Sequence, residues 1–221
     1  MKDNRLEKLA DVLVNYATNV KKGDRVAISA EDCAIPFIKA VARAAVKKGA
    51  LVEYYVDVPD VDAELLKNGT SEQYARPNQR FGACASSDVW ISAWGSENTK
   101  TMQSIPAEHL KDRRLANKEN RKLYTERMGS GALRWCGTQF PTNAEAQMAG
   151  MSLEEYEDFV YGAGFLYEDD PVAKWKEMAA EQEKWVQYLN GKKELHIISV
   201  DTDITVNIAG RKWINCCGQE N

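Results

Sequence analysis

The sequence predicts an α/β fold: a three-layer, doubly wound, mostly parallel sheet, with a C-terminal β-hairpin that begins a second antiparallel unit. Up to about residue 140, amphipathic helical segments alternate with short apolar strands, which is typical of a parallel sheet covered on both faces. From residue 194 the apolar residues follow a period of two, which is typical of antiparallel hairpins. We therefore predict an α/β N-terminal domain over residues 1–190 and a β-hairpin segment over residues 191–221.

Apolar spacing and turn residues predict the elements of the first part of the domain. Leu6, Leu9, Leu13 and Tyr16 share one face of a first helix, and Gly23 belongs to the turn that follows. Apolar, largely β-branched or aromatic runs predict strands over residues 25–30, 51–56, 88–94 and 132–137. Helices are expected over residues 36–48, 61–68, 71–85 and 105–128, with a break or kink at Pro77 in the third.

Helix-boundary signals predict the elements of the second part. Ser152 and Glu155 form a capping box at the start of one helix, and Asp170 and Pro171 open a longer one as N-cap and first residue. The long helix should end at Asn190, just before Gly191. The hairpin is expected over residues 194–200 and 203–208, and a turn leads from it into a further strand over residues 211–215.

Composition describes an ordinary globular chain. Of its 221 residues, 44% are hydrophobic and 28% are charged, and the mean hydropathy is −0.50. No apolar run reaches the roughly 18 residues of a membrane span, and the N-terminus lacks the continuous apolar core of a secretory signal. A net charge of −4 argues against nonspecific nucleic-acid binding, which relies on excess Lys and Arg. We expect a cytoplasmic protein with no nucleic-acid partner and no membrane partner.

Cysteine and histidine usage argues against a zinc site. The five cysteines are scattered without a Cys-x-x-Cys pair, which favours a reducing compartment. His109 and His196 lie far from any cysteine pair, and each is interpreted as a surface or structural residue. The six tryptophans fall mostly on predicted core stripes and are interpreted as packing residues: Trp90, Trp94, Trp135, Trp175, Trp185 and Trp213.

Two charged segments are candidates for binding. Glu31 and Asp32 follow the first strand, at the end where α/β sheets bind ligands, but solvated loop charge is the favoured interpretation. Residues 111–127 carry seven basic and three acidic residues, a local charge of +4, and are interpreted as a solvated or subunit-facing helix. The loops after the first and third strands lack the glycine-rich pattern that a dinucleotide or phosphate site needs.

The segment around residues 134–166 resembles one family. Its motifs have counterparts along essentially the whole chain, at residues 15–16, 22–26, 95–98, 134–142, 144–148, 149–156, 158–160, 170–171, 203–206 and 211–215. Together they resemble the thermophilic-type metallo-aminopeptidases of the aminopeptidase T and aminopeptidase S group. In that family a Ser-Asp pair commonly stands where this chain has Cys216-Cys217.

The resemblance implies a cytoplasmic homodimer that removes N-terminal residues from peptides with two divalent metals, zinc or cobalt. The family's metal ligands follow the counterpart of residues 213–221, so the resemblance carries no catalytic or metal-binding residue onto this chain. It implies a truncated, N-terminal half that shapes the substrate cavity and is inactive alone. By position only, Glu97, Trp135 and Thr138 are the candidates for lining that cavity.

Two other functions stay open at this point. The same scaffold could serve as a stand-alone, non-catalytic binding or regulatory module, and a stop codon after Asn221 would favour that hypothesis. An unrelated nucleotide-binding α/β domain is the weaker alternative, because the glycine loop is missing.

Overall fold

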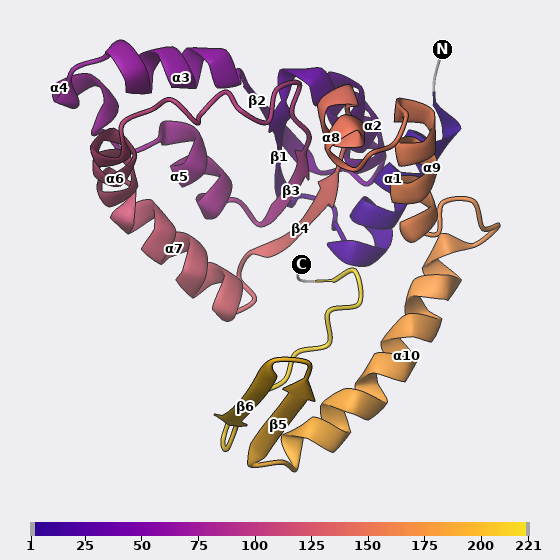
Figure 1. Cartoon of the computed structure of the whole chain (residues 1–221). Helices are drawn as coiled ribbons and strands as arrows, with labels where there is room; N and C mark the ends of the chain where they lie inside the picture. Colours follow the sequence, from indigo (N-terminus) through magenta and orange to yellow (C-terminus); the bar gives the residue numbers. More distant parts are fainter. Residues whose placement is uncertain (1–2, 220–221) are drawn as a thin grey trace.

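The computed structural model describes residues 3–219, and its centre is a parallel sheet of four strands (Figure 1). The strands are β1 (Arg25–Glu31), β2 (Leu51–Asp57), β3 (Val89–Trp94) and β4 (Arg134–Gln139), in the spatial order β2-β1-β3-β4. Their register places Ile28 beside Tyr54 on one side and beside Ile91 on the other. The predicted parallel sheet is confirmed, and its connections reverse direction between β1 and β3.

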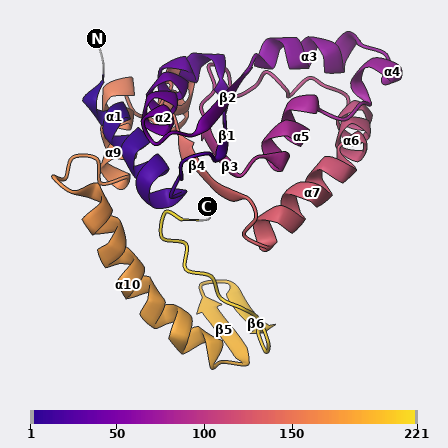
Figure 2. The same cartoon turned by 180° about the vertical axis from the view of Figure 1, so that it is seen from behind.

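One face of the sheet is covered by the N-terminal helices (Figure 2). These are α1 (Asn4–Asp11), the π-helical turn η1 (Val12–Ala17) and α2 (Ile35–Lys47), which follows the short 3-10 helix η2 (Asp32–Ala34). Alternate strand residues point toward them, because successive side chains of a strand face opposite sides of the sheet. The core of the molecule lies here and includes Val14, Val26, Ile28, Phe37, Val41, Val89 and Ile91.

The other face is covered by helices that follow β2 and β3. α5 (Gln79–Ser86) packs on the sheet and on α7 (Lys118–Gly129), while α3 (Pro59–Asn68), α4 (Ser71–Tyr74) and α6 (Ala107–Ala116) extend this layer (Figure 1). The sheet therefore has helices on both faces, which confirms the three-layer prediction. The predicted interruption at Pro77 is also confirmed, because α4 and α5 are separate helices on either side of it.

The prediction of one long helix over residues 105–128 is wrong. α6 ends at Ala116 and α7 begins at Lys118, with the buried Asn117 between them at φ −90° and ψ 12°. The Asn117 side-chain oxygen accepts a hydrogen bond from the backbone N–H of Asn78 at 2.7 Å, and its amide donates to the Arg113 carbonyl at 2.9 Å. A contact with a residue 39 positions away therefore fixes the helix break.

Helices and a hairpin complete the chain. α8 (Asn143–Met148) and α9 (Leu153–Ala163) precede the long α10 (Pro171–Asn190), and both bonds of the predicted capping box between Ser152 and Glu155 are present. β5 (Glu194–Ser199) pairs antiparallel with β6 (Thr202–Asn207), which confirms the predicted hairpin. In both views α10 leads away from the sheet and carries the hairpin at its far end. The division of the chain at Asn190 into two domains stays a prediction.

Three expectations are wrong, two about this last part of the chain and one about β3. Residues 211–215 form no strand, because no neighbouring strand pairs with them within residues 3–219. The packing interpretation fails for Trp185, which is 65% exposed because little of the described chain covers this part of α10, whereas Val172 and Trp175 near the start of the helix pack against the core. Trp94, at 58% exposed, also fails the packing interpretation because it stands at the open end of β3.

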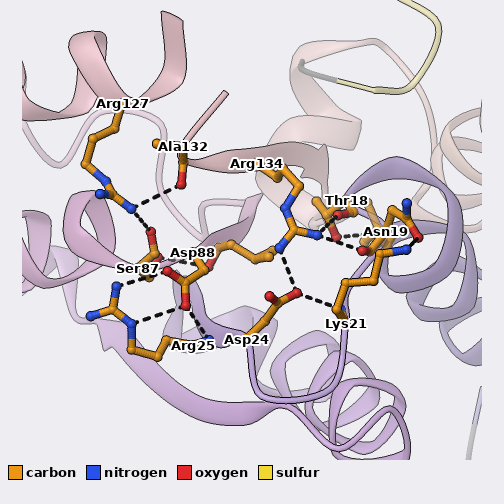
Figure 3. A network of polar contacts seen from close by, with 12 residues as sticks. Thr18, Asn19, Lys21, Asp24, Arg25, Ser87, Asp88, Arg127, Ala132 and Arg134 are labelled. Carbon is orange, nitrogen blue, oxygen red and sulfur yellow. Dashed lines mark hydrogen bonds and ion pairs between the residues drawn. The ribbon is translucent and has the colours of Figure 1, made fainter. Parts of the chain in front are cut away.

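A network of arginine contacts joins the amino ends of β1, β3 and β4 (Figure 3). The Arg134 guanidinium donates to the carbonyls of Thr18 and Asn19 at 3.1 and 2.7 Å and pairs with Asp24 at 2.7 Å. It thereby connects β4 to the loop that leads into β1. Nearby, Arg127 donates to the Ser87 and Ala132 carbonyls at 2.8 and 3.1 Å.

Arg25 and Asp88 form the second part of this network. The Asp88 carboxylate accepts hydrogen bonds from the Arg25 backbone N–H at 2.9 Å and from its guanidinium at 3.0 Å. The side-chain hydrogen bond from Arg25 is the main reason that the pKa of Asp88 falls to about 2.

None of the helices within residues 3–219 combines the length and apolar character needed to cross a bilayer.

Candidate functional site

A cleft of about 710 Å³ lies between the sheet and the layer formed by α5, α6 and α7. Side chains of β1, β3 and β4 form its floor, and Glu31 and Asp57, the last residues of β1 and β2, stand at its acidic rim. The cleft thus opens at the carboxyl edge of the sheet and includes the ends of β1 and β3, between which the connections reverse. That position is the usual ligand site in open α/β sheets.

Aromatic rings form the apolar surface of the cleft. Trp90 is oriented by a hydrogen bond from its indole N–H to the hydroxyl of Ser29, at 2.8 Å. The Trp90 ring packs against Phe81 at 5.9 Å and edge-on against Tyr124 at 5.6 Å, and Tyr124 packs edge-on against Trp135 at 6.4 Å. Edge-to-face packing of this kind fixes the rings against one another. The cleft therefore has a continuous, ordered aromatic surface.

The acidic rim is partly neutralised. Arg80 pairs with the Asp57 carboxylate at 2.6 Å. Burial nevertheless raises the pKa of Asp57, since the desolvation cost of its charge exceeds the attraction of Arg80. Burial also raises the pKa of Glu31, and the negative charges of Asp57, Asp32 and Glu145 add to that effect. The rim therefore disfavours a further negative charge.

Arginines line the opposite wall of the cleft, and they differ in how they are bound. Arg113 donates to the backbone carbonyls of Tyr74 and Arg76 at 3.2 and 3.3 Å and lies 4.0 Å from the carboxylate of Asp62. Arg114 and Arg121 line the same cleft and are exposed, and within residues 3–219 neither guanidinium has a hydrogen-bond or ion-pair partner. With Arg80, the cleft holds four arginines against two carboxylates, a formal charge of +2.

The break between α6 and α7 positions this wall. Asn117 binds the backbone of Asn78, and the amide of Asn120 donates to the Asn78 carbonyl at 2.9 Å. Asn78 is in turn the N-cap of α5, where its side chain accepts from the Phe81 N–H at 3.1 Å. The helices that carry the arginines are therefore tied directly to the helix that carries Phe81.

The structure places the three predicted cavity residues in three different surroundings. Trp135 lines the cleft, and its buried indole nitrogen has no acceptor among the described residues. Thr138 lies three positions further along β4, so it faces the opposite side of the sheet and lines a second, largely apolar groove of about 370 Å³. Glu97 is exposed in the loop after β3 and lines neither cavity.

Glu97 belongs electrostatically to an acidic region around Cys33. The pKa of the Cys33 thiol rises to about 11, first through burial and then through the charges of Glu31, Asp32 and Glu97. The thiol donates to the Gly95 carbonyl at 3.3 Å, which links the segments after β1 and β3. A thiol with a raised pKa is a poor nucleophile near neutral pH, so this contact is structural.

The sequence interpretation missed the arginine wall, although a signal was present. Positions 110, 114, 117, 121 and 124 recur at spacings of three and four, and all of them line the cleft. Such spacing indicates one face of a helix. The sequence predicts a solvated or subunit-facing helix for the whole basic segment, whereas the structure brings Arg113, Arg114 and Arg121 to one side of the cleft.

The described residues do not form a metal site. Within residues 3–219 no group of three or more His, Cys, Asp or Glu side chains is arranged to hold a metal ion. The His109 ring donates from Nδ1 to the Leu66 carbonyl at 2.7 Å and stacks on Tyr74, with the ring centroids 4.5 Å apart. His196 lies on the hairpin with its Nε2 2.7 Å from the Asp203 carboxylate. Both histidines have the surface or structural roles that the sequence predicted.

Comparisons with known proteins agree on one family. The family profile described as thermophilic metalloprotease (M29) matches residues 2–221. Aminopeptidase T of Thermus thermophilus is 24% identical over 225 residues, which cover 94% of this chain and 54% of that protein. Aminopeptidase AmpS of Bacillus subtilis is 22% identical over 248 residues, which cover 98% of this chain and 57% of that protein.

A solved structure supports the fold. Wild-type AmpT from Thermus thermophilus matches with a TM-score of 0.71 at 23% sequence identity, over 92% of this chain and 53% of that one. The chain thus spans about half the length of the relatives it matches.

Proposed function

The chain belongs to the thermophilic metalloprotease (M29) family, and from that membership we propose that it forms the half of a metal-dependent aminopeptidase that shapes the peptide cavity. The observation that carries the proposal is how much of its relatives' length this chain covers. The chain matches the family profile over residues 2–221, yet it spans only 54% and 57% of two relatives that are named aminopeptidases. Its substrates, in this proposal, are peptides with a free N-terminus.

The proposed division of roles within the enzyme follows from the same partial coverage of the relatives. Divalent metals, zinc or cobalt by the resemblance, polarise the scissile carbonyl and activate water in such enzymes. We assign their ligands to the part of the relatives that this chain does not span. No catalytic step is assigned to residues 3–219, and the role of these residues is to bind and orient the peptide.

The exposed hairpin supports a larger assembly. Ile198 on β5 is 72% exposed and Ile204 on β6 is 50% exposed. A two-stranded hairpin alone is at best marginally stable in water, and further strands or a helix normally cover its apolar face. The hairpin segment therefore fits the beginning of an antiparallel unit that other residues complete. We also propose that the enzyme is a homodimer in the cytoplasm, and this part of the proposal rests on the resemblance alone.

Hydrolysis of leucine p-nitroanilide in the presence of zinc or cobalt tests this function. We expect no turnover by the 221-residue chain, and no stoichiometric retention of either metal after dialysis. A form extended through the downstream reading frame should bind metal and release p-nitroaniline.

A chelator-treated sample of each protein is the matched control. Chelator-sensitive turnover by the 221-residue chain would overturn the division of labour. A stop codon directly after Asn221 would favour the stand-alone binding module instead.

A further inference from the structure

We propose that the cleft between the sheet and α5–α7 binds the free α-carboxylate of a peptide through Arg114 and Arg121. The peptide nature of the ligand rests on the function proposed above. The selectivity for a carboxylate rests on the cleft itself, through its charge, its aromatic surface and the way its wall is held.

The charges of the cleft leave two cations available. Arg80 is paired with Asp57, and Arg113 is occupied by two backbone carbonyls. Arg114 and Arg121 have no partner among the described residues, although both line the cleft. A guanidinium presents a planar fork of N–H donors that matches the two oxygens of a carboxylate. These two side chains are therefore the ones that a ligand's anionic group would meet.

The rest of the cleft selects what carries that anionic group. Trp90 and Tyr124 offer an apolar surface beside the arginines, which suits the side chains of a peptide. Glu31 and Asp57 lie at the rim, where their half-buried carboxylates repel a second negative charge. A polyanion such as a nucleoside triphosphate fits poorly between the arginines and the acidic rim. A peptide fits it well. Its single terminal carboxylate can accept hydrogen bonds from the arginines, and the neighbouring N–H groups of its own backbone can donate to the acidic rim.

The wall that carries the two arginines is held before any ligand binds. Asn117 and Asn120 both bind the backbone of Asn78 and so fix α6 and α7 against the start of α5. A wall held in this way reduces the ordering cost of binding to that of the arginine side chains. A charge-assisted hydrogen bond contributes about 1.5–3 kcal/mol. Loss of one such bond should therefore weaken binding at least about 10-fold.

Calorimetric titration of the 221-residue chain with two forms of one tetrapeptide tests the inference. The probe ends in phenylalanine and is used as the free acid and as the C-terminal amide. We expect the free acid to bind at least about 10-fold more tightly than the amide. Arg114→Gln and Arg121→Gln should each weaken binding of the free acid by about the same factor and leave the affinity for the amide unchanged.

Lys118→Gln is the matched control, because Lys118 is an exposed cation at the start of α7 that does not line the cleft. It should leave both affinities unchanged, and urea unfolding should show that all three variants fold. Equal affinities for acid and amide, or equal losses in all three variants, would overturn the inference. The titration needs neither metal nor turnover, so a failure here is distinct from a failure of the hydrolysis test.

Discussion

The amino and carboxyl edges of the parallel sheet both carry arginines, and the two edges use them differently. At the amino edge, Arg25, Arg127 and Arg134 each bind a carboxylate or backbone carbonyls that join neighbouring strands. At the carboxyl edge, Arg80 and Arg113 are likewise bound, but Arg114 and Arg121 have no partner within residues 3–219 and line a cleft. The difference separates arginines that stabilise the fold from arginines that are available to a ligand.

The largest effect that can break this comparison is expected at Arg134. Arg134→Ala removes two hydrogen bonds to carbonyls of the loop before β1 and leaves the mostly buried Asp24 without its guanidinium. We expect the free energy of unfolding to fall by about 2–4 kcal/mol, because charge-assisted bonds are lost and buried acceptors lose their donors. Urea unfolding at pH 7 measures the loss as a lower midpoint at an unchanged slope.

Arg114→Ala is the control at the opposite edge. It removes an exposed guanidinium without a described partner, so its effect on stability should stay within about 0.5 kcal/mol. Equal losses in the two variants would show that the edges do not differ in the way described.

A smaller effect is expected from two aspartates whose pKa values move in opposite directions. Arg25 lowers the pKa of Asp88 to about 2, so the Asp88 carboxylate stabilises the fold above its ordinary pKa of 3.8 and loses that effect as the pH falls through 2. Burial raises the pKa of Asp57, so the protonated form stabilises the fold at low pH and that effect is lost as the pH rises through the raised value.

Urea unfolding between pH 2 and pH 7 of the Asp88→Asn and Asp57→Asn variants separates the two cases. The stability advantage of the wild type over Asp88→Asn should stay within about 1 kcal/mol and shrink below pH 4, because Asp88 is a third exposed. For Asp57→Asn, the free energy of unfolding of the wild type relative to that of the variant should instead increase as the pH falls. The same slope in both variants would contradict the assignment.

The smallest effect is expected at Gly137 on β4. A Cβ there would lie 2.5 Å from Cη2 and 2.8 Å from Cζ2 of Trp94, which lines the cleft. Trp94 is 58% exposed and can move, so Gly137→Ala should change stability by less than about 1 kcal/mol while displacing the indole. The emission spectrum of the tryptophans should shift, and the shift should disappear in a Trp94→Phe background.

Gly129→Ala is the matched control, because a Cβ at Gly129 meets nothing within 4 Å. An emission shift of the same size in that variant would show that the signal does not come from Trp94.

The sequence predicted the parts of the fold that depend on local pattern. The strand β1 is almost continuously apolar and buried from Val26 to Ala30, so its place in a covered parallel sheet could be inferred from composition alone. The break at Asn117 could not, because it depends on a bond to Asn78 in another element. Residues 211–215 have strand-like composition, but a strand forms only where a neighbouring backbone can pair with it.

The candidate site was predictable only in part. Trp135 was singled out by position and does line the cleft, whereas Thr138 and Glu97 lie elsewhere because strand alternation and loop direction separate them. The spacing of Arg114 and Arg121 could have been noticed in the sequence. The pairing of Asp57 with Arg80 could not have been noticed there, because it joins two different elements of the fold. This pairing helps to decide which arginines of the cleft are free.

The amides that hold the arginine wall have a consequence for the ionic medium. Asn117, Asn120 and Asn78 join the helices through bonds that carry no formal charge, so added salt does not screen these bonds. The field of Arg114 and Arg121 at the open cleft is screened over about 8–10 Å at physiological ionic strength. If the cleft binds a peptide carboxylate as proposed above, its preference for the free acid over the amide should be strong in dilute buffer and weak in concentrated salt.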